Sequence, residues 1–136
     1  MAGQVYVLPD PVIALIQYLR LRPEVTALLP AVNIRTSLPS TPSWPYVLIT
    51  AAGGTGIWPG LDDASLQVDS LGGTQDQCSL LARTVRAAIW AIQNDTVPAG
   101  VLASGVEELG PQWLPDQVPT IPVSRFVARY RVILHR

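Results

Sequence analysis

The sequence predicts an α+β fold, in which a single, mostly antiparallel sheet of about five strands carries two main helices packed on one side. Two kinds of pattern lead to this fold class. Two segments repeat apolar residues at helical spacing, and several others alternate apolar and polar residues as strands do. The chain of 136 residues has no internal repeat and no linker-like stretch. We therefore expect residues 1–136 to form one domain.

The N-terminal third is predicted to contain the first main helix and two strands. The helix begins after Asp10, because an Asp side chain can cap free backbone N–H groups and the Pro that follows is tolerated in a first turn. Pro23 ends this helix, and a short second helix is expected over residues 24–29. Asn33–Leu38 and Tyr46–Ala51 are predicted to be strands, and the second of them is apolar on both faces, as central strands are.

A segment rich in Gly and Pro, Gly53–Gly60, is predicted to be a long hairpin loop with Trp58 at its tip. A phosphate cradle would need this segment to open a helix, but a further strand, Ser65–Leu71, follows it. We therefore interpret the segment as a connection, and Trp58 as an anchor for a partner protein. The alternative is that Trp58 folds back over its own sheet.

The second main helix is predicted over Gln75–Gln93. Thr74 and Gln77 have the spacing of a capping box, which marks a helix start. Its apolar stripe consists of Cys78, Leu81, Ala82, Val85, Ile89 and Ile92. An apolar helix stripe and an apolar strand face must bury each other. We therefore expect the helix residues Leu81, Val85 and Ile89 to pack on three residues of the final strand, Phe126, Tyr130 and Val132.

The remaining elements are two strands and an irregular connection. Val101–Leu109 is predicted to be a strand with Gly105 as a bulge. Gly110–Asp116 and the residues from Pro119 to Pro122 are predicted to be rigid and irregular. The final strand is Arg125–His135, whose side chains alternate between a core face with Phe126, Ala128, Tyr130, Val132 and Leu134 and an opposite face with Arg125, Arg129 and Arg131.

The composition argues against an enzyme. The chain has no Lys, its only Cys is Cys78 and its only His is His135, which leaves the usual nucleophile, base and metal-ligand sets incomplete. The adjacent carboxylates Asp62-Asp63 and Glu107-Glu108 would point to opposite faces of their strands, so we interpret them as solvated charge. We expect no catalytic residue, no metal and no cofactor.

Partner proteins are expected instead. Charged residues make up 14% of the chain, against roughly 25% in an average soluble domain, which suggests that other chains cover part of the surface. The net charge of −1 gives no field that would attract nucleic acid or an anionic membrane. Interfaces favour Trp and Arg, so the candidate interface residues are Trp58, Leu61, Arg83, Arg86, Trp90, Trp113, Arg129 and Arg131.

Three of these candidates have a simpler interpretation. Trp90 can be covered by the stem of an Arg side chain on its own helix. The arginines of the final strand, including Arg129 and Arg131, could meet phosphates, but we favour a solvated face or pairing with acidic residues across a subunit boundary.

Two segments of the chain resemble a known family. Residues 66–74, LQVDSLGGT, lead directly into a helix rich in Ala and Arg, and residues 110–116, GPQWLPD, precede the strand that begins RFVARY. Together they resemble tail-terminator proteins of long-tailed, siphovirus-type bacteriophages, especially those of actinobacterial hosts. The resemblance is good over residues 61–136 and looser before them. An all-Arg set of basic residues fits a GC-rich genome of that kind.

The resemblance implies an α+β subunit that assembles into a hexameric ring in the virion. Such a ring, assembled in the host cytoplasm, sits at the head-proximal end of the tail, stops polymerisation of the tail tube protein and joins the head–tail connector proteins. DNA passes through its lumen without sequence readout, and no membrane is involved. The alternatives are another neck or tail-completion protein of the same virion region and, from a different class, a small nucleic-acid-binding accessory protein.

Overall fold

The computed structural model of the chain describes residues 3, 5, 7–57, 60–118 and 121–136. Its elements, in chain order, are α1 (Pro11–Arg20), α2 (Pro23–Thr26), a 3-10 turn (Ala31–Asn33), β1 (Ile34–Arg35), β2 (Tyr46–Ile57), β3 (Leu61–Leu71), α3 (Gln75–Trp90), β4 (Gln93–Val97), β5 (Gly100–Trp113), β6 (Asp116–Val118), β7 (Ile121–Val123) and β8 (Arg125–His135).

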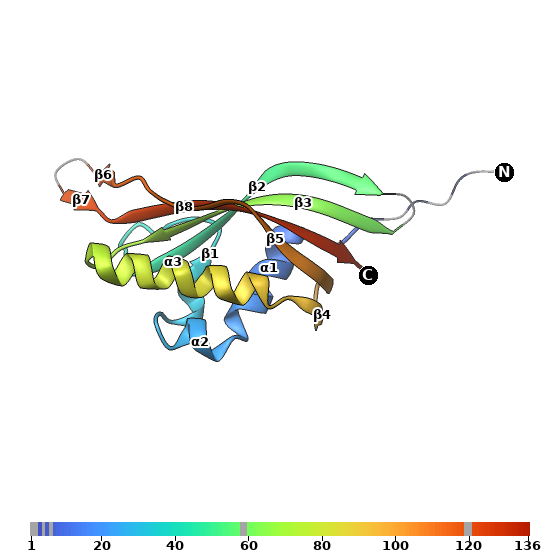
Figure 1. The fold of residues 1–136 in the computed structure, drawn as a ribbon, viewed down its shortest axis with the longest axis horizontal. Coiled ribbons are helices and arrows are strands. Elements are labelled where there is room, and N and C mark those ends of the chain that lie inside the picture. Colours follow the sequence, from blue (N-terminus) through green and yellow to red (C-terminus); the bar gives the residue numbers. More distant parts are fainter. Residues whose placement is uncertain (1–2, 4, 6, 58–59, 119–120) are drawn as a thin grey trace.

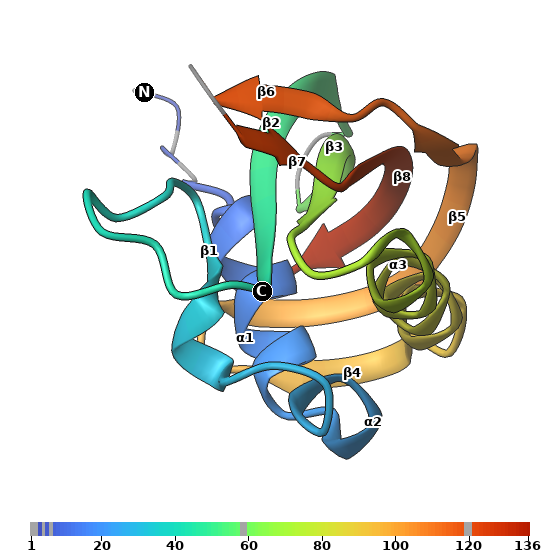
Figure 2. The same ribbon diagram turned by 90° about the vertical axis from the view of Figure 1, so that its left-hand side faces the viewer.

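The main sheet has six strands in the order β1-β2-β3-β8-β5-β4, and β6 pairs with β7 in a separate hairpin. β1 runs parallel to β2, and the other neighbours are antiparallel. The helices lie on one side of the sheet (Figure 1), and the sheet curls around them when it is seen from its end (Figure 2). The predicted α+β class with helices on one side is therefore confirmed, but the sheet is mixed and has six strands rather than about five.

The first N-terminal helix forms as the sequence predicts, whereas the short second helix, α2, covers Pro23–Thr26 instead of residues 24–29. The Asp10 carboxylate accepts a hydrogen bond from the Val12 N–H at 2.9 Å, which caps α1, and Leu15 and Leu19 are fully buried. The Tyr18 hydroxyl donates to the Ala88 carbonyl oxygen at 2.6 Å. This buried bond ties α1 to α3, and burial raises the pKa of Tyr18 above its ordinary value.

The capping box of α3 is confirmed. The Gln77 N–H donates to the Thr74 hydroxyl at 3.2 Å, and the Gln77 side chain accepts from the Thr74 N–H at 2.9 Å. The helix ends at Trp90, earlier than predicted, because the chain turns there into β4, which the sequence analysis missed.

The predicted packing of α3 on the sheet is largely confirmed. The helix residues Leu81, Val85 and Ile89 share one buried cluster with Tyr130 and Val132. Phe126 is the exception. It is only partly buried and its ring lies 5.2 Å from that of Trp113.

The prediction of a loop over Gly53–Gly60 is wrong for its first half. β2 continues to Ile57 and stays paired with β3 as far as Leu61, with a bulge between Ala51 and Gly54. Gly54 has a φ of +141°, and a Cβ there would lie 2.3 Å from the Asp63 carbonyl oxygen. Gly54 is thus a position where two strands approach closely. Trp58 lies outside the described residues.

Three of the other strands differ from prediction in length, and one of them, β3, begins at Leu61 rather than at Ser65. β6 and β7 include residues that were predicted to be irregular. The predicted strand Asn33–Leu38 is reduced to β1, because the Asn33 side chain donates to the carbonyl oxygens of Ser43 and Pro45, at 2.9 and 2.8 Å, and holds the preceding turn. β5 extends to Trp113 and so includes four residues predicted to be irregular.

The glycine predicted as a bulge in β5 has another role. Gly105 pairs with Val132, and the register of β5 shifts elsewhere. A Cβ at Gly105 would lie 2.4 Å from the Ile89 carbonyl oxygen. The residue therefore allows α3 to approach β5 closely.

Candidate interaction surfaces

The face of the sheet that points away from the helices carries the arginines of β8. Arg125 forms an ion pair with Asp69, with Nη2 and Oδ2 3.0 Å apart. Arg131 pairs with Asp63, with Nε and Oδ1 3.0 Å apart. In both cases the carboxylate lies diagonally across the β3–β8 ladder, where long side chains reach one another. The acidic partners therefore come from the same chain, not from across a subunit boundary.

Arg129 lies between these two pairs, opposite Gln67 on β3. Its side chain is exposed, and within the described part of the chain no acidic group lies at ion-pair distance from it. Arg129 and Arg131 border a shallow depression whose other walls come from β2, β3 and Glu108 on β5. This depression is polar, and Arg129 is the cation in it that is open to a partner.

The ion pair at Asp63 depends on pH in a defined direction. The hydrogen bond from Arg131 holds the pKa of the Asp63 carboxyl below its ordinary value. A lowered pKa in the folded state means that the pair favours folding at neutral pH, and that this contribution disappears as the pH falls through the lowered pKa. The Arg131 side chain of the pair is exposed, so solvent screens the effect.

Arg86 and Trp90 meet on the free side of α3. The Arg86 guanidinium lies 4.2 Å from the centre of the Trp90 ring, and its Nε lies 2.7 Å from Oε1 of Glu107 on β5. One face of Trp90 is thus covered by its own helix, yet 51% of the residue remains exposed. Arg83 is also exposed, and its Nε donates to the Ser79 hydroxyl at 3.3 Å.

The other candidates lie at the ends of the sheet. Trp113 ends β5, packs on Phe126 and is 37% exposed, whereas Leu61 begins β3 and is 39% exposed. Trp58, three residues before Leu61 in the sequence, falls outside the described residues. The seven candidates that the structure describes therefore do not form one patch. They are divided between the outer sheet face, the free side of α3 and the strand ends.

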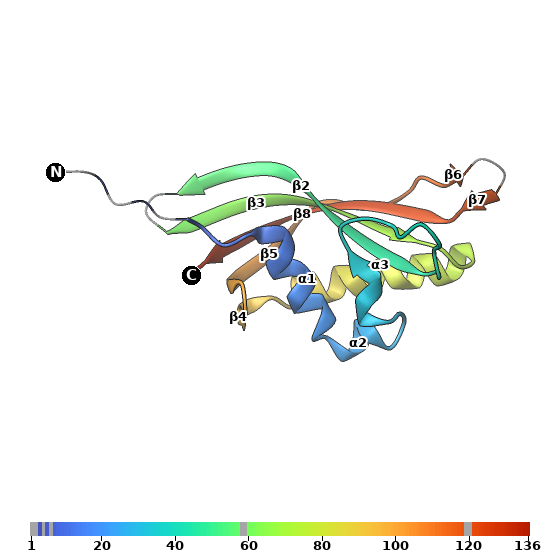
Figure 3. The ribbon, with the colours of Figure 1, turned by 180° about the vertical axis from the view of Figure 1, so that it is seen from behind.

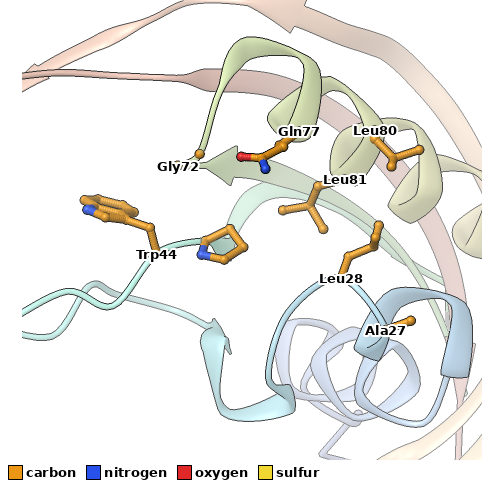
Figure 4. A pocket seen from close by; sticks show the side chains of 9 residues that line it. Ala27, Leu28, Trp44, Gly72, Gln77, Leu80 and Leu81 are labelled. Atoms are coloured by element: carbon orange, nitrogen blue, oxygen red, sulfur yellow. The ribbon is translucent and has the colours of Figure 1, made fainter.

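A pocket that the sequence analysis missed lies between α2, the segment before β2 and the start of α3. Its volume is about 410 Å³, and its walls include Leu28, Trp44 and Leu81. Figure 4 shows Leu28 and Leu81 on one side and Trp44 on the other. Leu80, which is 44% exposed, lines it and a neighbouring groove beside Arg83. In the sequence, the position of Leu80 next to the apolar stripe of α3 was the only feature that could have indicated this pocket.

Comparison with known proteins gives one informative result. No protein-family model matches this chain, and the search of curated proteins found no match. Among solved structures, a chain from "Virion of native gene transfer agent (GTA) particle" is similar, with a TM-score of 0.65 and 16% sequence identity. The match covers 93% of this chain and 95% of that chain. The two chains share one fold.

In the ranges that the structure covers, no three His, Cys, Asp or Glu side chains lie close enough together to hold a metal ion, and no helix there is long and apolar enough to cross a membrane. Cys78 is buried, and burial raises its pKa to about 11. Its thiol is therefore protonated at neutral pH and a poor nucleophile.

Proposed function

We propose that this chain is a structural protein of a phage-like virion, and specifically a subunit of a hexameric ring at the head-proximal end of the tail. The ring ends the growth of the tail tube and joins it to the connector proteins of the head, and its lumen lets DNA pass. The chain acts by assembly and carries out no chemistry.

One observation carries the proposal: the fold is shared over 93% of the chain with a chain of a gene transfer agent virion. The resemblance of residues 66–74 and 110–116 to tail-terminator proteins narrows the role within the virion. In the structure these segments lead into α3 and into the β6–β7 hairpin, so both belong to the part of the fold around the end of β3 and the start of β8.

The exposed side chains also favour assembly over nucleic-acid binding. Arg125 and Arg131 already bind carboxylates of the same chain, which leaves few free cations on the outer sheet face for phosphates. Exposed apolar residues occur on both sides of the molecule, among them Leu80 and Trp90 on α3 and Val106 and Leu109 on β5. In the proposed ring, neighbouring subunits would cover these residues.

The test is to examine the purified protein by light scattering and negative-stain imaging, alone and with tail tubes. We expect oligomers or rings, and caps at one end of the tubes. A strict monomer that leaves tubes uncapped would contradict the ring proposal. Attachment to the connector without capping would favour the neck-protein alternative, and DNA binding that weakens steeply with salt would favour the accessory protein.

Trp90→Ala is expected to weaken assembly while leaving the fold intact. The residue is half exposed, and truncating an aromatic anchor at an interface typically costs about 2 kcal/mol or more. Thermal melting and ring formation should be measured on the same preparation, with Trp90→Phe as the control that keeps a ring on Arg86. A lower melting temperature with normal assembly would show that Trp90 only covers the Arg86 side chain.

A further inference from the structure

β2 has one long unpaired edge. On the side away from β3, its only partner among the described strands is β1, which pairs with Val47 and Leu48 alone. From Ile49 to Ile57 no strand among the described residues pairs with β2 on that side. Residues 50–56 are all exposed. The bulge after Ala51 bends the strand, but Gly54–Ile57 remain paired with β3.

This edge lacks the features that usually protect an open strand. Natural sheets cover their edges or place charges and prolines on them, because unpaired N–H and C=O groups invite another strand. The sequence from Ile49 to Ile57, ITAAGGTGI, contains no charged residue and no proline. Its small side chains leave the backbone accessible. The edge is therefore suited to accept a strand from another chain.

The chain before α1 has the character of such a strand. Val5 and Val7 are 85% and 81% exposed, and the run Val-Tyr-Val at residues 5–7 consists of strong strand formers. The structure describes residues 3, 5 and 7 of this N-terminal arm. Pro9, at the base of the arm, packs against Gly100 at the start of β5, where a Cβ would lie 2.9 Å from the Pro9 Cγ atom.

The arm leaves the body close to the end of β2. Leu8 lies by Gly56, where a Cβ would be 3.8 Å from its Cδ1 atom. The helix that follows this segment, α1, lies on the helical side of the sheet (Figures 1 and 3), and Val5 and Val7, which precede it, are largely exposed. No backbone hydrogen bond of Val5 or Val7 to the rest of the described chain is formed. Val5 and Val7, which have a high strand propensity, are thus exposed in the segment that reaches the unpaired edge of β2 at Leu8.

We propose that the N-terminal arm of one copy adds as an extra strand to the open β2 edge of a neighbouring copy. An extended chain spans about 3.3 Å per residue. Residues 3–7 of the arm would therefore cover roughly half of the edge, which has nine residues. The donated arm and the accepting edge are different surfaces, and a contact between unlike surfaces links copies head to tail and can close into a ring. The inference rests on the proposed ring and names the contact that would build it.

The direct test uses cysteines in separate copies. One variant carries Val5→Cys, the other carries Thr50→Cys or Thr55→Cys on the β2 edge, and both have Cys78 replaced by Ser. After mixing, oxidation or a short bis-maleimide should give a crosslinked dimer containing one copy of each variant. Val5→Cys mixed with Val106→Cys, which is exposed on β5 away from this edge, is the matched control and should give only background.

A second test uses the backbone dependence of strand addition. Val5→Pro/Val7→Pro removes two N–H donors from the arm, whereas Val5→Thr/Val7→Thr keeps them together with a high strand propensity. Because each backbone hydrogen bond contributes about 1 kcal/mol, the proline pair should raise the dissociation constant of the oligomer by roughly tenfold or more. The threonine pair should change it little.

The outcomes separate this contact from the proposed function. Rings that cap tubes, form equally well with the proline pair and give no mixed crosslink would overturn the arm contact and leave the function standing. A mixed crosslink without tube capping would support the contact and contradict the function. A protein that stays monomeric, both at its highest soluble concentration and with tubes, would overturn the contact. So would a double variant, Val5→Cys/Thr55→Cys, that forms its crosslink only within single chains.

Discussion

Replacing Val85 with Asp is expected to abolish soluble, folded protein. Val85 is 1% exposed and belongs to the buried cluster between α3 and the sheet, together with Tyr130 and Val132. A carboxylate there would be buried without a partner, which costs several kcal/mol. That is a large fraction of the roughly 5–15 kcal/mol by which a domain is stable. Soluble yield and circular dichroism of the variant measure the effect.

The control is Ala87→Asp, on the exposed side of the same helix. This variant introduces the same charge at nearly the same point of α3 and should remain folded, with a melting temperature close to that of the original protein. If both variants are equally soluble and cooperative, the buried face of α3 has been assigned wrongly. If both fail, a negative charge anywhere on this half of the helix is harmful, and the packing argument loses its support.

Gly105→Ala is expected to destabilise the protein by about 3 kcal/mol, although the change adds a single methyl group. That methyl would lie 2.4 Å from the Ile89 carbonyl oxygen and 2.8 Å from the Ile89 Cγ2 atom. Since the nearer atom belongs to the helix backbone, the whole of α3 would have to move away from β5. The free energy of unfolding, measured in denaturant, should fall accordingly.

Gly56→Ala is the matched control for this substitution. A Cβ at Gly56 would meet only the Leu8 Cδ1 atom, at the ordinary contact distance of 3.8 Å. We expect its stability to change by less than about 1 kcal/mol, in either direction. Equal losses for the two alanine variants would show that the close approach of α3 to β5 is not what requires Gly105.

The sequence predicts those parts of the fold that follow from local patterns. The capping box at Thr74 and the apolar stripe of α3 are local features, and both were correct. The Gly-rich segment after Ala51 misled the analysis, because Gly normally breaks strands, whereas here Gly54 is needed where β3 comes within van der Waals distance. The requirement for Gly54 comes from the neighbouring strand β3, so the pattern of residues within β2 alone does not reveal it. The short strand β1 was likewise shortened by side-chain hydrogen bonds from Asn33 to distant carbonyls.

The sequence selected the candidate interface residues by their type, but their positions relative to one another depend on the fold. Alternation correctly put Arg129 and Arg131 on the face away from the core, but the diagonal pairing of Arg131 with Asp63 depends on the register between β3 and β8. The contact of Arg86 with Trp90 follows from their spacing of one turn on a helix. Its link to Glu107 needs the sheet as well. The open edge of β2 could not be predicted, because it follows from the shortness of β1.

The position of β8 in the middle of the sheet has a consequence for synthesis in the cell. β8 is the shared neighbour of β3 and β5, yet the ribosome makes residues 125–135 only after both of those strands. Until then β3 and β5 have no common partner, and the apolar face that Tyr130 and Val132 complete stays open. A nascent chain is thus unable to close its sheet early. Interrupted translation would yield fragments without a finished core, whose exposed apolar surface makes them prone to aggregate.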